Sequence, residues 1–207
     1  MLLSCLIAFA VPPAAPALTV ADFWPMTPGV TRTYKLREDQ RTGELTETVG
    51  QPANIGGKEV VPIIASIGGF VQSHVYYAIV GDTLMQMAVS DTELLKTPVP
   101  VMKVGETSVK WSYTQLSPVS PKPLPLTVTA EAVRKGKRRI LGVDREILEV
   151  KYSTQSPRGA YPDFKCNQTA VYAAGVGEVE FDTEYSVGKR TTTRKLELTA
   201  FTPGTSK

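Results

Sequence analysis

The sequence predicts an all-β protein built on a large, curved antiparallel sheet, arranged as a half-barrel, a barrel or a sandwich, with almost no helix. Short stretches of alternating apolar and polar residues recur along the chain, and about ten to twelve of them are long enough to be strands. The chain also has 16 glycines and 16 prolines, which supply many turns between these stretches. Apolar residues do not repeat at helical spacing over a useful length, and Asp91 to Leu95 is the nearest approach to a helical turn.

The best-defined strands form a hairpin that ends the chain. From Glu178 to Tyr185 apolar and acidic residues alternate, so one face of this strand is expected to be buried and the other solvated. A turn predicted at Val187 and Gly188 returns the chain and places Glu180 opposite Lys195. The acidic residues assigned to the solvated face are Glu178, Glu180, Asp182 and Glu184.

Two segments in the first half of the chain have features of edge strands. Residues 44–49 are short and charged, which suits an edge. Residues 60–67 are apolar at both parities, as in a buried strand, but Pro62 lacks the N–H that a central strand needs. Gly68 and Gly69 then turn the chain into residues 70–80, which completes a predicted hairpin.

Two later strands carry the apolar residues that best suit a ligand. Alternate residues of 109–113 share one face, and alternate residues of 126–130 share one face of the next long strand. Because sequential strands usually pair, we expect the two rows to lie side by side. The candidate ligand-binding residues are Val109, Trp111, Tyr113, Leu126 and Val128. An apolar strand face is equally a core or a pocket lining, so both interpretations stay open, with the 154–165 loop as a candidate lid.

One domain and a leader account for the 207 residues. Residues 1–17 resemble a signal peptide, since an apolar run is followed by small residues, and residues 18–207 form a single β-rich domain. The leader lacks the usual basic residues. Cys5 resembles the lipidated cysteine of bacterial lipoproteins but lies too near the start of the chain for a leader to precede it. The sequence therefore favours simple export, to the periplasm or the extracellular space, over a lipid anchor.

The charge balance and the cysteine content exclude two further classes. The chain has 23 Lys and Arg against 20 Asp and Glu, and a net charge of +3 predicts no nucleic-acid partner. Beyond the leader the only cysteine is Cys166, so the domain has no internal disulfide to form.

No residues form a recognisable catalytic, metal-binding or cofactor-binding set, so we expect no enzyme and no cofactor. His74 is the only histidine, and neither a nucleophile nor a second metal ligand is identifiable beside it. The acidic row of the last hairpin suits calcium or paired carboxylates, and equally a solvated strand face. A predicted turn at Lys135 and Gly136 lies in a basic cluster that suits lipid headgroups, and equally a charged hairpin tip. The other residues of that cluster are Arg134, Lys137, Arg138 and Arg139.

Two short segments near the ends of the mature chain resemble a family of secreted bacterial β-rich proteins. The opening segment runs from Phe23 to Tyr34 around two prolines and Gly29, and its first aromatic residues are expected to form an apolar plug. The closing segment runs from Tyr172 to Val179 around Gly175 and Gly177. The resemblance implies an exported domain with a large curved antiparallel sheet, akin to bacterial lipoprotein carriers, and it implies no activity.

Three hypotheses for function follow from the sequence. The first is an exported, non-enzymatic domain that binds an apolar small molecule, lipid or acyl chain on the concave face of its sheet. The second is a structural or interaction module of the cell envelope, with an envelope protein as partner and a core filled by its own side chains. An exported hydrolase ranks third. The oligomeric state is left open.

Overall fold

In the part of the chain that the structure describes, strands follow one another from Thr31 to Thr202, and every strand pair is antiparallel. The computed structural model describes residues 17–116, 124–159 and 163–205, so the predicted signal peptide lies outside it except for residue 17. Within these ranges strands make up 69% and helix 2%, which confirms the all-β prediction. The elements are α1 (Val20–Phe23), β1 (Thr31–Glu38), β2 (Arg41–Val49), β3 (Ala53–Ile55), β4 (Lys58–Ile67), β5 (Phe70–Val80), β6 (Thr83–Ala88), β7 (Val99–Lys103), β8 (Ser108–Leu116), β9 (Pro125–Ile140), β10 (Val143–Gln155), β11 (Phe164–Ala173), β12 (Gly177–Val187) and β13 (Arg190–Thr202).

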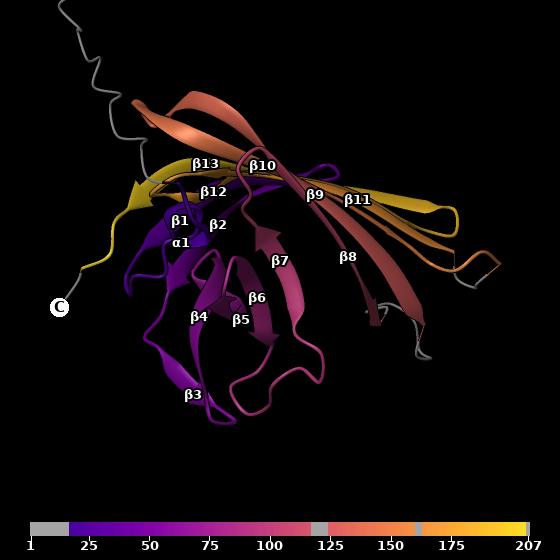
Figure 1. Cartoon of the computed structure of the whole chain (residues 1–207). Helices are drawn as coiled ribbons and strands as arrows, with labels where there is room; N and C mark the ends of the chain where they lie inside the picture. The colour runs from indigo at the N-terminus through magenta and orange to yellow at the C-terminus, as the bar shows by residue number, and fades with distance from the viewer. Residues whose placement is uncertain (1–16, 117–123, 160–162, 206–207) are drawn as a thin grey trace, which may run out of the picture.

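A single sheet contains all of the described strands. Its order is β7-β6-β5-β4-β2-β1-β13-β12-β11-β10-β9-β8, and β3 pairs with β4 beside this path. The sheet curls until its two outer strands, β7 and β8, lie close to each other, so it is nearly closed into a barrel. Figure 1 shows the long strands β8 to β13 curving across the smaller group of strands β3 to β7. No helix of the described ranges has the length and apolar character needed to cross a bilayer.

The last hairpin, formed by β12 and β13, is present, but its predicted register is wrong. The turn lies at Gly188 and Lys189, one residue later than predicted. Gly188 has a φ of +60°, so the first turn position takes the left-handed backbone that a two-residue hairpin turn requires. In consequence Asp182, and not Glu180, lies opposite Lys195.

The predicted turn at Lys135 and Gly136 is also wrong. β9 continues through both residues, and the glycine lies at a β-bulge in the pairing with β10. A bulge needs one extra residue on one strand, and glycine accepts its unusual backbone without strain. The hairpin turns at Leu141 and Gly142, which both have positive φ.

The edge strands differ from those predicted. β2 and β4 are both internal to the sheet, whereas β7 and β8 form its edges. Pro62 is tolerated in β4 because it lies between two ladders: the pairing with β3 covers only residues 58–60, and the pairing with β2 begins at Ile63. Residues 91–95 form no helical turn, so that expectation is wrong, and the helical turn α1 instead leads into the opening segment and ends at its first residue, Phe23.

The opening segment plugs one end of the curled sheet. Phe23 and Trp24 are buried in the largest core cluster, together with residues from most of the sheet. Hydrogen bonds hold the residues just before this segment: the Gly175 N–H donates to the carbonyl of Asp22 at 2.6 Å, and Arg134 Nη2 donates to the carbonyl of Leu18 at 2.8 Å. We refer below to the face of the sheet that carries this cluster as the inner face.

Candidate functional site

The two predicted apolar rows lie side by side on the inner face. The sequence order predicted that β8 and β9 pair, and in this pairing Trp111 lies opposite Ala130 and Tyr113 lies opposite Val128. The β9 row is buried, including Leu126, whereas the β8 row is half-buried. Burial raises the pKa of Tyr113 to about 12, so its hydroxyl stays neutral. The β8 row therefore lies at the rim of the interior, and the β9 row lies within it.

The sheet is open between β7 and β8, and side chains bridge this gap. No backbone ladder joins these two strands in the part of the chain that the structure describes. Instead Trp111 Nε1 donates to the carbonyl of Pro100 at 3.4 Å, and the hydroxyl of Tyr152 donates to the carbonyl of Val101. The Trp111 and Tyr152 rings meet edge to face, with centroids 6.2 Å apart. We call this contact of β7 with Trp111 of β8 and Tyr152 of β10 the seam.

Aromatic rings fill the interior between the seam and the plug. Trp24 packs against Tyr77 and Tyr172 at centroid distances of 5.7 and 5.8 Å. Burial raises the pKa of Tyr77, Tyr152 and Tyr172, so these phenols act as neutral hydrogen-bonding groups. The plugged end of the interior is thus occupied by the protein's own side chains.

A cluster of charged side chains lies on the inner face next to these rings. It consists of Arg32 on β1, Glu47 on β2, Glu178 on β12 and Arg194 on β13, and we call it the interior charge cluster. Arg32 Nη1 lies 3.7 Å from Glu47 Oε2, and this arginine is fully buried whereas the glutamate is 18% exposed. The Tyr34 hydroxyl donates to Glu47 Oε2 and to the carbonyl of Glu178, each at 3.1 Å.

Hydrogen bonding within the interior charge cluster is incomplete. Arg32 Nε donates to the carbonyl of Val176 at 2.7 Å, and Nη2 donates to the carbonyl of Pro25 at 3.2 Å. Its guanidinium also lies 4.8 Å from the centre of the Trp24 ring, within cation–π range. Within the described residues, no hydrogen-bond partner meets Arg32 Nη1 or Arg194 Nε. Buried donors of this kind are uncommon and suit either strain or a ligand.

Burial raises the pKa of Glu178 to about 8, and the nearby carboxylate of Glu47 adds to this effect. The sequence placed Glu178 on the solvated face, and that prediction is wrong. A bulge between β11 and β12 pairs Tyr172 with Glu178 but Val171 with Glu180, which moves the first carboxyl onto the inner face. The alternating pattern of β12 gives no sign of this displacement.

The opening and closing segments that carry the family resemblance meet at Arg32. Arg32 belongs to the opening segment, and it contacts Val176 and Gly177 of the closing segment. A Cβ added to Gly177 would lie 2.5 Å from Arg32 Nε and 2.7 Å from its Cζ. The second glycine of the closing segment therefore makes room for a buried guanidinium.

Replacing this glycine tests the close approach. We expect Gly177→Ala to destabilise the fold by about 2 to 4 kcal/mol, because Gly177 has a φ of +102° and the buried guanidinium has no space to retreat. Gly43→Ala is the matched control, since a Cβ there meets nothing within 4 Å. Urea unfolding of both variants measures the difference, and equal stabilities would contradict the close approach.

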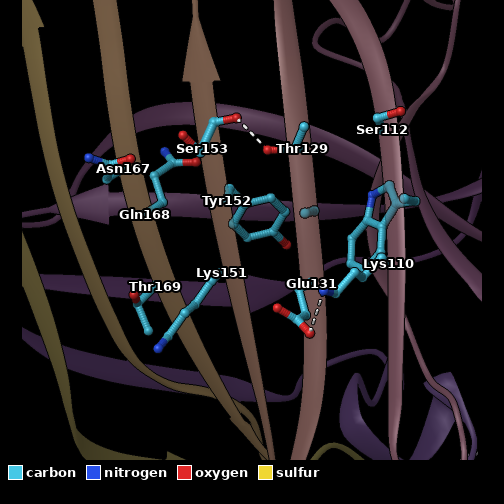
Figure 2. Close-up of a pocket in the computed structure, with 12 residues that line it drawn as sticks. Lys110, Ser112, Thr129, Glu131, Lys151, Tyr152, Ser153, Asn167, Gln168 and Thr169 are labelled. Atoms are coloured by element: carbon cyan, nitrogen blue, oxygen red, sulfur yellow. Dashed lines mark hydrogen bonds and ion pairs between the residues drawn. The ribbon is translucent and has the colours of Figure 1, made fainter.

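An open groove of about 870 Å³ lies along β8 to β11, and Trp111 and Tyr152 of the seam are among its lining residues. Most of the other lining side chains are polar, and Figure 2 shows the ion pair between Lys110 and Glu131. Lys110 Nζ lies 3.4 Å from Glu131 Oε1, and Lys151 Nζ lies 3.4 Å from Glu149 Oε1. Exposed pairs of this kind are typical of a solvated strand face.

The other candidate sites that the sequence suggested are also explained by ordinary surface ion pairs or by burial. Carboxylates neutralise most of the basic cluster of β9: Lys135 pairs with Glu149, Lys137 with Glu146 and Arg138 with Glu180, at 3.2, 3.9 and 3.1 Å.

His74 is exposed on β5. Cys166 is buried beside the hydroxyl of Thr183, and burial raises the pKa of its thiol. Within the described ranges no group of three or more His, Cys, Asp or Glu side chains is arranged to hold a metal ion.

The fold and its interior define a class of protein: a nearly closed antiparallel β-sheet, plugged at one end, with a charged cluster inside. No family model and no curated protein matches the chain. Two crystal structures are similar to it, those of a "putative lipoprotein" from Parabacteroides distasonis and a "putative exported protein with YmcC-like fold" from Bacteroides fragilis. Their sequence identities are 12% and 11% and their TM-scores 0.48 and 0.43, and each match covers 87% of this chain and 98% of the other. Neither similarity is close enough to assign a function.

Proposed function

We propose that the protein is an exported, non-enzymatic binding protein of the bacterial cell envelope, and that it takes up an apolar ligand through the seam between β7 and β8. The ligand class is a lipid or a free acyl chain. The predicted signal peptide supports export, and the seam supports uptake.

The observation that carries the proposal is the way in which the seam is closed. Neighbouring strands along the sheet path are joined by backbone ladders, whereas in the described structure β7 is held by side-chain hydrogen bonds from Trp111 of β8 and Tyr152 of β10. Each neutral hydrogen bond contributes about 0.5 to 1.5 kcal/mol, so opening two of them requires far less free energy than separating a ladder. The half-buried apolar row of β8 lies directly at this opening.

The interior beyond the seam has the composition of a ligand site. Ligand pockets combine a mostly apolar lining with a few polar groups that fix the orientation of the ligand. Here the apolar rows and the aromatic rings lie next to the interior charge cluster, in which Arg194 is half-buried and has an unsatisfied donor. An amphipathic ligand would place its chain along the rows and its polar end towards this cluster.

A second function, an interaction module with a filled core, is favoured by one observation. Leu126 and Val128 have almost no exposed surface, as expected for residues packed in a core. Under this alternative Trp111 is a packing residue, and Trp111→Ala destabilises the protein by about 3 to 5 kcal/mol.

Uptake of a fluorescent fatty acid by the purified protein separates the two functions. If the seam is a portal, Tyr152→Phe removes the bond to Val101 and speeds association at least threefold, while Trp111→Ala weakens binding at least tenfold with little loss of stability. Tyr76→Phe is the control, because Tyr76 is buried in the separate cluster beneath β3. Absence of uptake by the wild type, together with severe destabilisation by Trp111→Ala, would overturn the proposal and favour the filled core.

A further inference from the structure

The hairpin formed by β4 and β5 ends in an exposed apolar tip. The tip comprises residues 67–72, turned by Gly68 and Gly69, which both have positive φ and form a two-residue turn. Phe70 is 77% exposed and Val71 is 56% exposed, the first being the most exposed large apolar side chain in the described structure. Exposed apolar residues that cluster in this way mark contact surfaces more often than isolated ones do.

The hairpin lacks formal charge beyond its first two residues, Lys58 and Glu59. From Val60 to Gly81 the chain has no Asp, Glu, Lys or Arg, although these residues make up 21% of the sequence. Exposed strand edges of soluble proteins usually carry such charges, which keep other strands and apolar surfaces away. Their absence removes the largest free-energy penalty for entering a lipid headgroup layer, the desolvation of charge.

The geometry of the tip disfavours another strand as its partner. Residues 70–75 of β5 have no neighbour on the side away from β4 within the described residues, because β6 pairs only from Tyr76. However, a bulge at Gln72 interrupts this edge, and bulges prevent regular strand addition. The Gln72 side chain donates to the carbonyl of Phe70 at 3.0 Å. The Phe70 carbonyl at the tip therefore has a hydrogen-bond donor within the protein. Backbone groups that enter lipid need such a partner, because no water is present there.

We propose that this tip inserts into the headgroup and acyl boundary of a phospholipid bilayer, with Phe70 and Val71 as the inserted side chains. The tip carries no cation, so it fits a zwitterionic surface and does not depend on anionic lipid. This inference rests on the outer end of the hairpin and does not depend on the interior ligand.

Flotation with phosphatidylcholine vesicles tests the proposal. We expect the wild-type domain to float with these vesicles equally at about 0.1 M and about 1 M salt, because no charge is involved. Phe70→Ser combined with Val71→Ser should reduce binding at least tenfold. The matched control is Leu141→Ser with Val143→Ser on the β9–β10 tip, where the two side chains are 52% and 51% exposed beside Arg139 and Asp144, and it should bind as the wild type does.

Three results would overturn the proposal. The first is absence of wild-type binding to these vesicles, and the second is binding that needs anionic lipid and disappears in high salt. The third is a dimer of the wild-type protein, detected by light scattering, that the Phe70 and Val71 substitutions convert to a monomer. This result would show that the tip binds a second copy of the chain. Thermal melts of all variants confirm that they are folded, since every substituted side chain is exposed.

Discussion

Replacing Arg32 by leucine should destabilise the protein by about 3 to 5 kcal/mol, the range measured when one partner of a buried ion pair is removed. The fully buried guanidinium pairs with Glu47, binds two backbone carbonyls and lies over Trp24. Without it, the carboxylate is left without its partner, and the carbonyls of Pro25 and Val176 lose a donor. The loss should be visible as a lower urea midpoint with an unchanged slope.

Two further variants separate the effect of the Arg32 charge on stability from the effect of its packing. Arg37→Leu is the control, since Arg37 is exposed on the same strand, and we expect a change within about 0.5 kcal/mol. Arg32→Leu combined with Glu47→Leu removes both charges, and it should recover part of the lost stability, because no buried carboxylate remains. If Arg32→Leu is no more destabilising than Arg37→Leu, the guanidinium does not hold the two segments together.

Stability should fall as the pH rises from about 4.5 to about 8, in step with the ionisation of Glu178. The folded protein keeps this proton up to about pH 8, whereas the unfolded chain releases it near the ordinary carboxyl pKa of 4.5. Between these values the folded state binds more protons, so its advantage is complete below the lower value and is lost as the pH passes the upper one. Because the side chain keeps some contact with solvent, we expect a change on the order of 2 to 4 kcal/mol.

Glu178→Gln isolates this contribution, because glutamine resembles the protonated acid at every pH. The stability of the variant relative to wild type should increase steadily from pH 5 to pH 9 in urea unfolding. Glu180→Gln is the control on the same strand, where the carboxyl pairs with Arg138 on the outer face. A Glu178→Gln difference that stays constant across this range would show that the carboxyl titrates as it does in the unfolded chain.

Much of the fold could be predicted because strands and turns are local features. Period-2 alternation and paired glycines located most strands, and the sequence order of β8 and β9 correctly predicted that their apolar rows lie side by side. The errors in predicted turn and side-chain orientation lie at β-bulges, where one strand has one residue more than its partner. The bulges at Gly136 and near Glu178 leave the apolar alternation intact, so a turn was predicted at the first and a solvated carboxyl at the second.

The sequence by itself determined the all-β class, the antiparallel hairpins and the two apolar rows, because each depends on residues close together in the chain. The tertiary structure alone decided which strands form the edges, and it brought β7 to Trp111 and Tyr152 to make the seam. It also assembled the interior charge cluster from β1, β2, β12 and β13. Arg32 and Val176 are 144 residues apart, and no local pattern records which distant carbonyl a buried guanidinium will meet. That choice follows from the curvature of the whole sheet and from the desolvation that its closure imposes.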